Sequence, residues 1–250
     1  MKRLQGVWKL LRLIAHCVSG LITIWTVFPK LTPSQREQKV TAWAKGVLRA
    51  LKVELVVTGQ PGFKGPLMLV ANHTSWLDIA VLHAGLFSRF VAKHELRPWP
   101  VIGFMAAQSG TLFLERRSRR DAMRLVHQIA KCLQDGEVVA VFPEGTTSDG
   151  ASVLPFHGNL LQAAISVNAP VQPVHIQYLD SRSGRRSAAP NYVGEVHFLV
   201  SLWATLCAEN LSVSVHFGPS EWASGRSRRT WATDLHATVS AMQQRAEKTT

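Results

Sequence analysis

The chain has 250 residues, 46% hydrophobic and 18% charged, so it can bury the core of one substantial domain, and wholesale disorder is excluded. A balance of 28 Lys and Arg against 16 Asp and Glu gives a net charge of +12, which favours nucleic acid, anionic lipid or a phosphate-bearing substrate as partner. Eight Trp side chains favour a membrane interface among these, and three dispersed Cys argue against a disulfide framework or a zinc cluster.

The chain begins with basic residues and the apolar stretch Leu13–Phe28. This stretch lacks the small-residue cleavage site of a signal peptide and is shorter than the about 20 residues of a full membrane span. We therefore expect a retained membrane anchor, either re-entrant or a short span, with its basic end on the cytoplasmic side. A buried core helix is the alternative.

A basic amphipathic helix is expected next. Thr32 and Pro33 are typical of a helix start, and apolar residues then recur at spacings of three and four up to Leu51, with Lys and Arg off that face. Directly after a hydrophobic segment, such a helix suits a membrane interface. An ordinary surface helix packed on the core fits the same pattern.

From residue 53 on, short apolar runs alternate with helical stretches. The expected strands are Val53–Thr58, Leu67–Ala71, Arg89–Ala92, Thr111–Leu114, Val138–Phe142, Val171–Gln177 and Val213–Phe217. The expected helices are Leu77–Phe87, Val101–Gln108, Arg119–Gln134, Asn159–Val167 and Arg228–Arg245, and Ser181–Pro190 is expected to be a loop. The alternation predicts an α/β fold with a mixed, largely parallel sheet flanked by helices. We expect residues 1–52 to form an N-terminal membrane-docking helical pair and residues 53–250 a single domain.

The most informative segment is Leu69–Asp78, where a strand leads into Asn72 and His73 and a helix begins near Trp76. On one continuous helix, the separation of five residues between His73 and Asp78 would turn them roughly 140° apart. With His73 in the loop and Asp78 in the first helical turn, the carboxylate can instead orient the imidazole as a general base. On its own, such a pair is more often structural.

Two further segments carry polar groups directly after expected strands. Gly110–Arg116 ends in Glu115 and Arg116, and strand ends of open α/β sheets are where ligands bind. Arg is a forked donor for phosphate, although a solvated, basic helix start is the alternative here. Phe142–Ser148 places Glu144 and three hydroxyl side chains on a turn.

A fourth segment, Ala169–Val174, is an apolar strand with two prolines that would alone be assigned to the core. In this order, Asn-His-x4-Asp, Gly-x-x-Phe-x-x-Arg, Phe-Pro-Glu-Gly-Thr and this strand resemble the glycerolipid acyltransferase family typified by lysophosphatidate acyltransferases. The resemblance covers roughly residues 67–174, and the first and third motifs are highly specific together. The N-terminal segment resembles the membrane-docking helices of bacterial members, which implies the cytoplasmic face of the bacterial inner (plasma) membrane.

The resemblance implies transfer of an acyl chain from acyl-CoA or acyl carrier protein to the free hydroxyl of a lysolipid. The first-choice acceptor is 1-acyl-glycerol-3-phosphate, which gives phosphatidate. His73 would take the hydroxyl proton while Asp78 orients it, and no metal or other cofactor is implied. Because Gly-x-Ser-x-Gly is absent and Ser75 suits a helix cap better than a nucleophile, no acyl-enzyme is expected.

The remaining motif positions imply substrate binding. Arg116 is expected at an anionic headgroup, and Pro173 is expected to shape the acyl or donor site. The full set of expected substrate-binding residues is Gly110, Phe113, Arg116, Glu144, Gly145, Thr146 and Pro173.

One position departs from the phosphatidate-forming members, many of which have Arg where this chain has Thr147. The loss of one guanidinium, with Asp149 nearby, lowers the positive potential around an acceptor phosphate. Thr147 also resembles bacterial members that acylate lyso-ornithine lipid, whose amine Asp149 could attract. Lyso-ornithine lipid is therefore the second expected acceptor.

Two other classes compete with an acyltransferase. A non-catalytic nucleic-acid binder would interleave aromatic and basic residues on an exposed face, a pattern this chain lacks, so no nucleic acid is expected. A non-catalytic lipid-binding membrane protein remains open. A lysolipid hydrolase would use water as acceptor, and the missing nucleophile motif argues against it.

Overall fold

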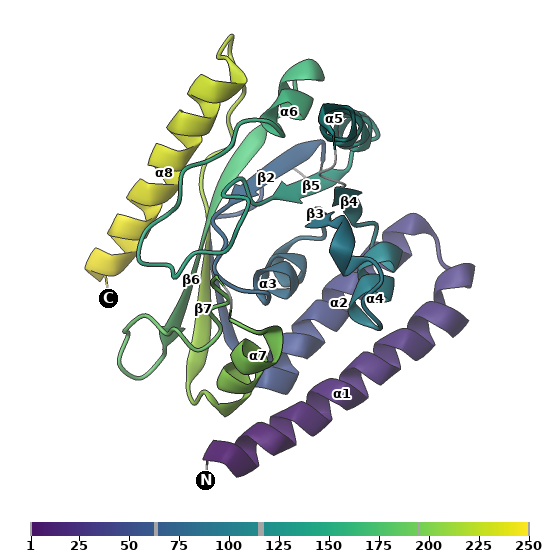
Figure 1. Ribbon diagram of the computed structural model, residues 1–250, viewed down its shortest axis with the longest axis vertical. Helices are drawn as coiled ribbons and strands as arrows, with labels where there is room; N and C mark the ends of the chain where they lie inside the picture. Colours follow the sequence, from purple (N-terminus) through teal and green to yellow (C-terminus); the bar gives the residue numbers. More distant parts are fainter. Residues whose placement is uncertain (1, 63–64, 115–117, 195, 250) are drawn as a thin grey trace.

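The computed structural model describes residues 2–62, 65–114, 118–194 and 196–249 (Figure 1). The strands are β1 (Glu54–Thr58), β2 (Leu67–Ala71), β3 (Arg89–Lys93), β4 (Leu112–Leu114), β5 (Val138–Val141), β6 (Val171–Asp180) and β7 (Leu211–Phe217). The α-helices are α1 (Lys2–Thr26), α2 (Pro33–Leu51), α3 (Asp78–Gly85), α4 (Ile102–Gln108), α5 (Arg119–Gln134), α6 (Leu161–Ser166), α7 (Phe198–Cys207) and α8 (Arg228–Thr249). Two 3₁₀ turns, η1 (Phe28–Lys30) and η2 (His94–Leu96), complete the elements of the described residues.

The strands form one sheet in the order β1-β7-β6-β2-β5-β3-β4. The pairing of β6 with β7 is antiparallel and the other pairings are parallel, so β1 and β7 run against the remaining strands. The predicted mixed, largely parallel sheet is confirmed. The central strands β2 and β5 are fully buried, which explains why both appear in the sequence as uninterrupted apolar runs.

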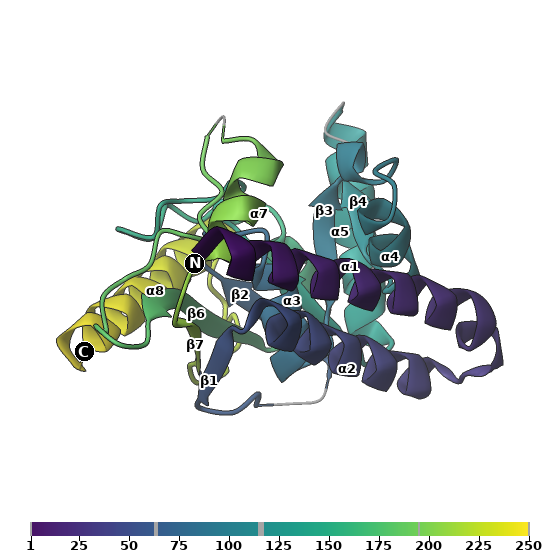
Figure 2. The ribbon, with the colours of Figure 1, turned by 90° about the horizontal axis from the view of Figure 1, so that it is seen from below.

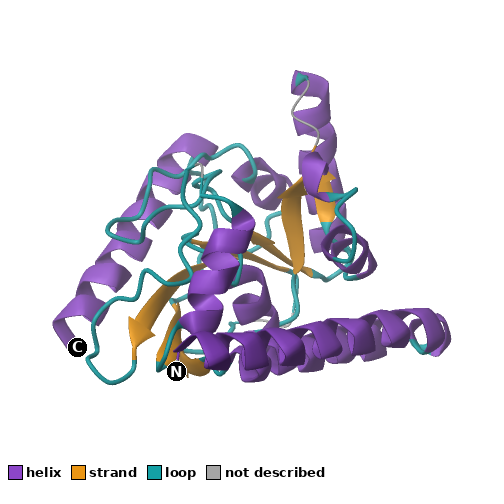
Figure 3. Ribbon diagram, turned by 60° about the horizontal axis from the view of Figure 1, so that its bottom comes forward, coloured by secondary structure: helices purple, strands orange, loops and turns teal. Residues whose placement is uncertain are grey.

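Helices cover both faces of the sheet, as Figures 1 and 3 show. Side chains of α2, α3 and α7 pack on one face together with Leu67, Leu69 and Ala71 of β2. Side chains of α5, α6 and α8 pack on the other face with Met68 and Val70. The two-residue alternation along β2 therefore sends neighbouring side chains into different cores.

The predicted elements are found with small shifts at their ends, but α7 was not predicted. Strand β6 runs three residues beyond the predicted end at Gln177, because its antiparallel pairing with β7 continues to Asp180 and Leu211. The predicted start of α2 is confirmed: Thr32 accepts the backbone N–H of Gln35, whose side chain accepts that of Thr32. The Ser181–Pro190 segment is a loop, as expected.

The apolar face of α2 is buried rather than open to a membrane. Ala44, Val47, Leu48 and Leu51 pack into the core with α3, which is the packing that the alternative of a surface helix predicts. Contact of α2 with a membrane stays a prediction. The basic residues of α2 lie on the opposite, exposed side.

Helix α1 differs from α2 because many of its large apolar side chains are exposed. Seen from below in Figure 2, it crosses the molecule between α2 and α7. Its 25 residues extend the expected apolar stretch back to Lys2, and among the described helices it alone is long and apolar enough to cross a membrane, by length and composition. Eight of its large apolar side chains are exposed and form what we call the outer face of α1, made of Leu4, Val7, Trp8, Leu11, Ile14, Val18, Ile22 and Trp25.

The inner side of α1 carries Leu10 and Leu13, which pack against the core, together with polar or small residues. Lys9 is only 1% exposed and donates to the carbonyl of Ala208, at the carboxyl end of α7, at 2.7 Å. Burial lowers the pKa of Lys9. At Gly6 an added Cβ would lie 2.9 Å from the sulfur of Cys207, so α1 and α7 are in close contact there.

Candidate active site

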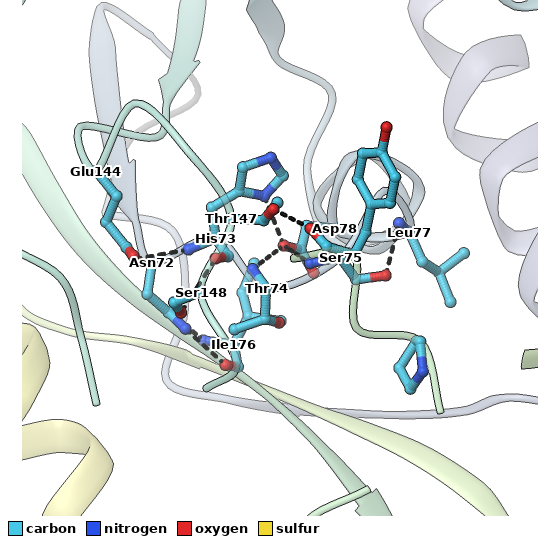
Figure 4. A network of polar contacts seen from close by, with 12 residues as sticks. Asn72, His73, Thr74, Ser75, Leu77, Asp78, Glu144, Thr147, Ser148 and Ile176 are labelled. Atoms are coloured by element: carbon cyan, nitrogen blue, oxygen red, sulfur yellow. Dashed lines mark hydrogen bonds and ion pairs between the residues drawn. The ribbon is translucent and has the colours of Figure 1, made fainter. Parts of the chain in front are cut away.

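The loop after β2 is held to the neighbouring strand by Asn72. Its side-chain amide donates to the carbonyl of Ile176 at 2.9 Å, and its side-chain oxygen accepts the backbone N–H of the same residue at 2.7 Å. Asn72 is buried, so both bonds are shielded from water. This double contact ends β2 at a fixed point and sets the direction in which His73 leaves the sheet (Figure 4).

His73 and Asp78 meet as the sequence predicts. Asp78 is the first residue of α3, and its Oδ2 lies 2.8 Å from Nδ1 of His73. The backbone N–H groups of Thr74 and Ser75 donate to the same oxygen at 2.8 and 3.0 Å. Asp78 is fully buried, whereas the His73 side chain is 20% exposed. A carboxylate bonded to Nδ1 leaves Nε2 as the nitrogen that can accept a proton.

The second oxygen of Asp78 is bonded by a residue that sequence reasoning missed. The hydroxyl of Tyr178, on β6, donates to Oδ1 of Asp78 at 2.7 Å. Burial, and then the nearby charge of Asp78, raises the pKa of Tyr178 well above its usual range, so the phenol stays a neutral donor. Val174, Ile176 and Tyr178 share one face of β6 by strand alternation, the only signal that could have placed it near the site.

The imidazole of His73 lies on an aromatic side chain from the next strand. Phe142 follows β5, and its ring stacks on that of His73 with centroids 4.0 Å apart and planes at 13°. Phe90 of β3 lies behind Phe142 at 6.0 Å. The two rings restrict His73 to one orientation and form an apolar wall beside its free nitrogen.

The loop that begins with Phe142 holds the backbone of His73 from both sides. Glu144 is 4% exposed and accepts the N–H of His73 at 2.8 Å and that of Leu154 at 3.3 Å. Ser148 donates its backbone N–H to the carbonyl of His73 at 2.8 Å. Burial raises the pKa of Glu144 to about 7, the charge of Asp78 adds to this, and the accepted N–H bonds oppose it.

The next three residues of this loop have separate surroundings. Gly145 adopts a φ of +71° and donates to the carbonyl of Phe142, which makes the turn. Thr146 is exposed. The hydroxyl of Thr147 donates to the carbonyl of Tyr192, whose own N–H donates to the carbonyl of Thr74. The segment around Tyr192 therefore lies against both loops that carry the site.

Gly110 lies away from His73, whereas Phe113 lies within β4, where it pairs with Ala92 of β3. Gly110 precedes β4, whereas His73 follows β2, and because these strands run in the same direction the two residues are at opposite edges of the sheet. An added Cβ at Gly110 would come within 2.3 Å of Nη1 of Arg89, and its φ is +79°, so the position favours glycine. The guanidinium of Arg97 lies 5.7 Å from the centre of the Phe113 ring.

Pro173 and Arg116 are the last two of the predicted substrate-binding residues. Pro173 is buried within β6 beside Val70 of β2, and its carbonyl accepts the N–H of Gly218. It alternates with Val174 and so faces the core of α5, α6 and α8, away from Tyr178. Arg116 lies outside the described residues, and among those residues no group of three or more His, Cys, Asp or Glu side chains could hold a metal ion.

A His–Asp pair with this geometry, at the carboxyl edge of a largely parallel sheet, has the chemistry needed to remove a proton from a hydroxyl group. The family described as Acyltransferase matches residues 35–177, more than half of the chain. The chain belongs to this family and is an O-acyltransferase.

Individual relatives agree with this assignment. The chain is 40% identical over 187 residues to the 1-acyl-sn-glycerol-3-phosphate acyltransferase of Neisseria gonorrhoeae, which covers 74% of this chain and 72% of that protein. It is 34% identical over 221 residues to the lyso-ornithine lipid O-acyltransferase of Pseudomonas aeruginosa, covering 86% and 84% of the two chains. The crystal structure of the 1-acyl-sn-glycerophosphate acyltransferase of Thermotoga maritima has the same fold, with a TM-score of 0.70 over 97% of this chain and 98% of that one at 20% identity.

Proposed function

We propose that this acyltransferase moves a fatty acyl chain from acyl-CoA or acyl carrier protein to the free hydroxyl of a lysolipid, with His73 as general base. The observation that carries the proposal is the 2.8 Å contact between Nδ1 of His73 and the buried carboxylate of Asp78. This contact fixes the ring and leaves Nε2 available. Glu144, Ser148 and Phe142 hold the residue in that position from the other sides.

The reaction is a direct displacement. Nε2 of His73 takes the proton of the acceptor hydroxyl as its oxygen attacks the thioester carbonyl carbon, and the C–O bond forms while the C–S bond breaks. The departing thiolate then takes the proton from the imidazolium, which restores the neutral base. The hydroxyl of Ser75, the nearest candidate nucleophile in sequence, is buried and accepts the N–H of Leu77 at 3.1 Å, which favours a capping role and direct transfer.

Lysophosphatidate is the first acceptor and lyso-ornithine lipid the second, as the names of the two relatives suggest. The hydroxyl of Thr147 donates to the carbonyl of Tyr192, so this donor is not free for an acceptor phosphate. This contact favours retaining lyso-ornithine lipid as the second acceptor. Asp149 is exposed beside Thr147, and the guanidinium of Arg186 donates to Gly150. A headgroup with an amine and a carboxylate would find both charges in this region.

The outer face of α1 supports the proposal that the enzyme works on a membrane, with the bacterial inner membrane and its cytoplasmic side as the location. This face carries two tryptophans and no acidic residue over the length of the helix. Such a face favours the boundary between headgroups and acyl chains.

The test is an acyl-transfer assay that offers lysophosphatidate and lyso-ornithine lipid side by side with a labelled acyl thioester. We expect product on lysophosphatidate that disappears in His73→Ala. His127→Ala, an exposed histidine on α5, is the matched control and should retain full activity. Activity that survives in His73→Ala contradicts the mechanism. Product on lyso-ornithine lipid alone would make that lipid the acceptor and leave the mechanism unchanged.

A further inference from the structure

The structure contains a groove between α1 and α2, with a volume of about 380 Å³. The two helices run next to each other along their length, as Figure 2 shows. The lining residues of the groove are Arg12, Ala15 and His16 from α1 and Gly46, Arg49 and Ala50 from α2. No acidic side chain is among them, and its walls are mostly small and apolar.

Contacts between His16 and Trp43 hold the floor of the groove together. Nε2 of His16 lies 2.9 Å from the carbonyl of Trp43, and the indole N–H of Trp43 donates to the carbonyl of His16 at 3.4 Å. The two rings also stack, with centroids 5.5 Å apart. A Cβ at Gly46 would come within 2.2 Å of the His16 ring, so only glycine allows α2 to approach α1 this closely.

The two arginines at the rim are available for a ligand. Arg12 and Arg49 are exposed, and within the described ranges neither side chain makes an ion pair or a hydrogen bond. Each guanidinium offers a planar fork of donors that matches two phosphate oxygens. Two of them over a floor of small residues, without a competing carboxylate in the lining, favour an anion held between the helices.

The groove also lies next to the outer face of α1. Arg12 directly follows Leu11 of that face and is therefore roughly 100° around the helix from it, toward α2. If the apolar side chains enter the acyl-chain region, the guanidiniums are at the depth of the lipid phosphates. The position of the groove and the charge of its two arginines then both favour a lipid phosphate as the ligand.

We propose that the groove between α1 and α2 binds the phosphate of an anionic glycerophospholipid of the membrane. The bound lipid is a structural component of the bilayer and not the acyl acceptor, because the groove belongs to the N-terminal helices rather than to the His73 loop. This inference rests on the membrane association proposed above but not on the identity of the acceptor. It gives the enzyme a headgroup preference in docking that is separate from its choice of substrate.

The experiment measures binding of the full chain to vesicles of phosphatidylcholine alone and of phosphatidylcholine mixed with phosphatidylglycerol at about seven to three, a composition that supplies the negative surface potential. The test variant combines Arg12→Gln with Arg49→Gln. The matched control combines Arg3→Gln with Lys45→Gln, two exposed basic residues on the same helices that do not line the groove. Thermal unfolding of both variants checks that they fold.

We expect the groove variant to lose at least about tenfold more of the phosphatidylglycerol-dependent affinity than the control, because both lose two charges but only one loses the forked contacts. Inorganic phosphate should not compete with the vesicles. Equal losses in the two variants would show that diffuse charge is sufficient and overturn the proposal. Competition by inorganic phosphate would replace the lipid by a free anion, and failure of the unaltered protein to bind either vesicle would contradict membrane docking itself.

Discussion

The polar network beneath His73 and the outer face of α1 are opposites. In the network, Asp78 is fully buried and bonded at both oxygens, and the backbone of His73 is held at its N–H and its carbonyl. On the outer face, the large apolar side chains are between 46% exposed, at Val7, and 84% exposed, at Trp25. The polar groups of the network are hydrogen-bonded within the chain, whereas the outer face of α1 can be covered only by something outside it.

The chemistry of the enzyme and its location therefore depend on separate regions of the molecule. Changes to the network should alter the rate of acyl transfer without altering membrane binding, because the network is enclosed in the domain. Changes to the outer face should do the reverse.

Asp78→Asn should break the network most severely. The amide cannot stabilise an imidazolium and can impose the wrong tautomer on His73, so kcat should fall by about 10³–10⁴-fold, as for the acid of a catalytic triad. Vesicle binding should not change. Asp135→Asn, which removes a surface partner of Lys131, is the control for both measurements. A rate within tenfold of normal would show that Asp78 does not orient the base.

Tyr178→Phe tests the least predictable member of the network. It removes one hydrogen bond to a charged group, which is worth about 1.5–3 kcal/mol, so kcat should fall roughly 10- to 100-fold with little change in KM. Tyr192→Phe removes the hydroxyl of the other tyrosine of the chain and should retain activity. If both variants lose activity equally, the contact between Tyr178 and Asp78 is not what matters.

Glu144→Gln tests the carboxyl that holds the His73 backbone. In the folded protein the pKa of Glu144 is raised from its usual value near 4.5 to about 7. Between pH 4.5 and 7 the folded state therefore keeps a proton on this carboxyl that the unfolded state has released. This contribution to stability is present at low pH and is lost as the pH rises through 7.

The free energy of unfolding of the unaltered protein, relative to Glu144→Gln, should therefore fall by on the order of 2 kcal/mol between pH 5 and 8. Urea denaturation across that range measures it. A difference that does not change with pH would show that Glu144 titrates normally.

Leu11→Ala on the outer face should have the smallest effect. Loss of part of its apolar contact with lipid should cost about 1 kcal/mol of membrane binding, or roughly fivefold in vesicle affinity. Acyl transfer to a dispersed short-chain acceptor should be unchanged. Met123→Ala, an exposed apolar side chain on α5, is the control. A comparable loss of activity on the dispersed acceptor would contradict the separation of the two regions.

The sequence predicts the parts of the fold and site that depend on local pattern. Apolar runs locate the strands, and the end of one strand before His73 together with a helix start near Trp76 puts His73 in a loop and Asp78 in the first helical turn. Tyr178 could not be predicted in the same way, because its contact with Asp78 joins positions 100 residues apart. Helix α7 was missed because it is short and almost uniformly apolar, without the period that distinguishes a helix from a strand.

The roles assumed for Gly110 and Pro173 show the limit of motif spacing. Gly110 accommodates the side chain of Arg89 at the far edge of the sheet, and Pro173 packs in the core behind the site. Their assignment to substrate binding stays a prediction, and the structure favours indirect roles for both. A motif specifies which residue types recur but not the strand direction that separates them in space.

The contact between Lys9 and Ala208 means that α1 is not a detachable anchor. Cutting the chain after this helix, as a route to a water-soluble catalytic domain, would remove the ammonium group that caps the end of α7. It would also uncover the side of α7 that Gly6 now touches and separate Trp43 from His16. The truncated protein would lose the outer face of α1 but expose the surface that α1 now covers. Detergent or lipid is therefore a better way than deletion to keep the enzyme in solution.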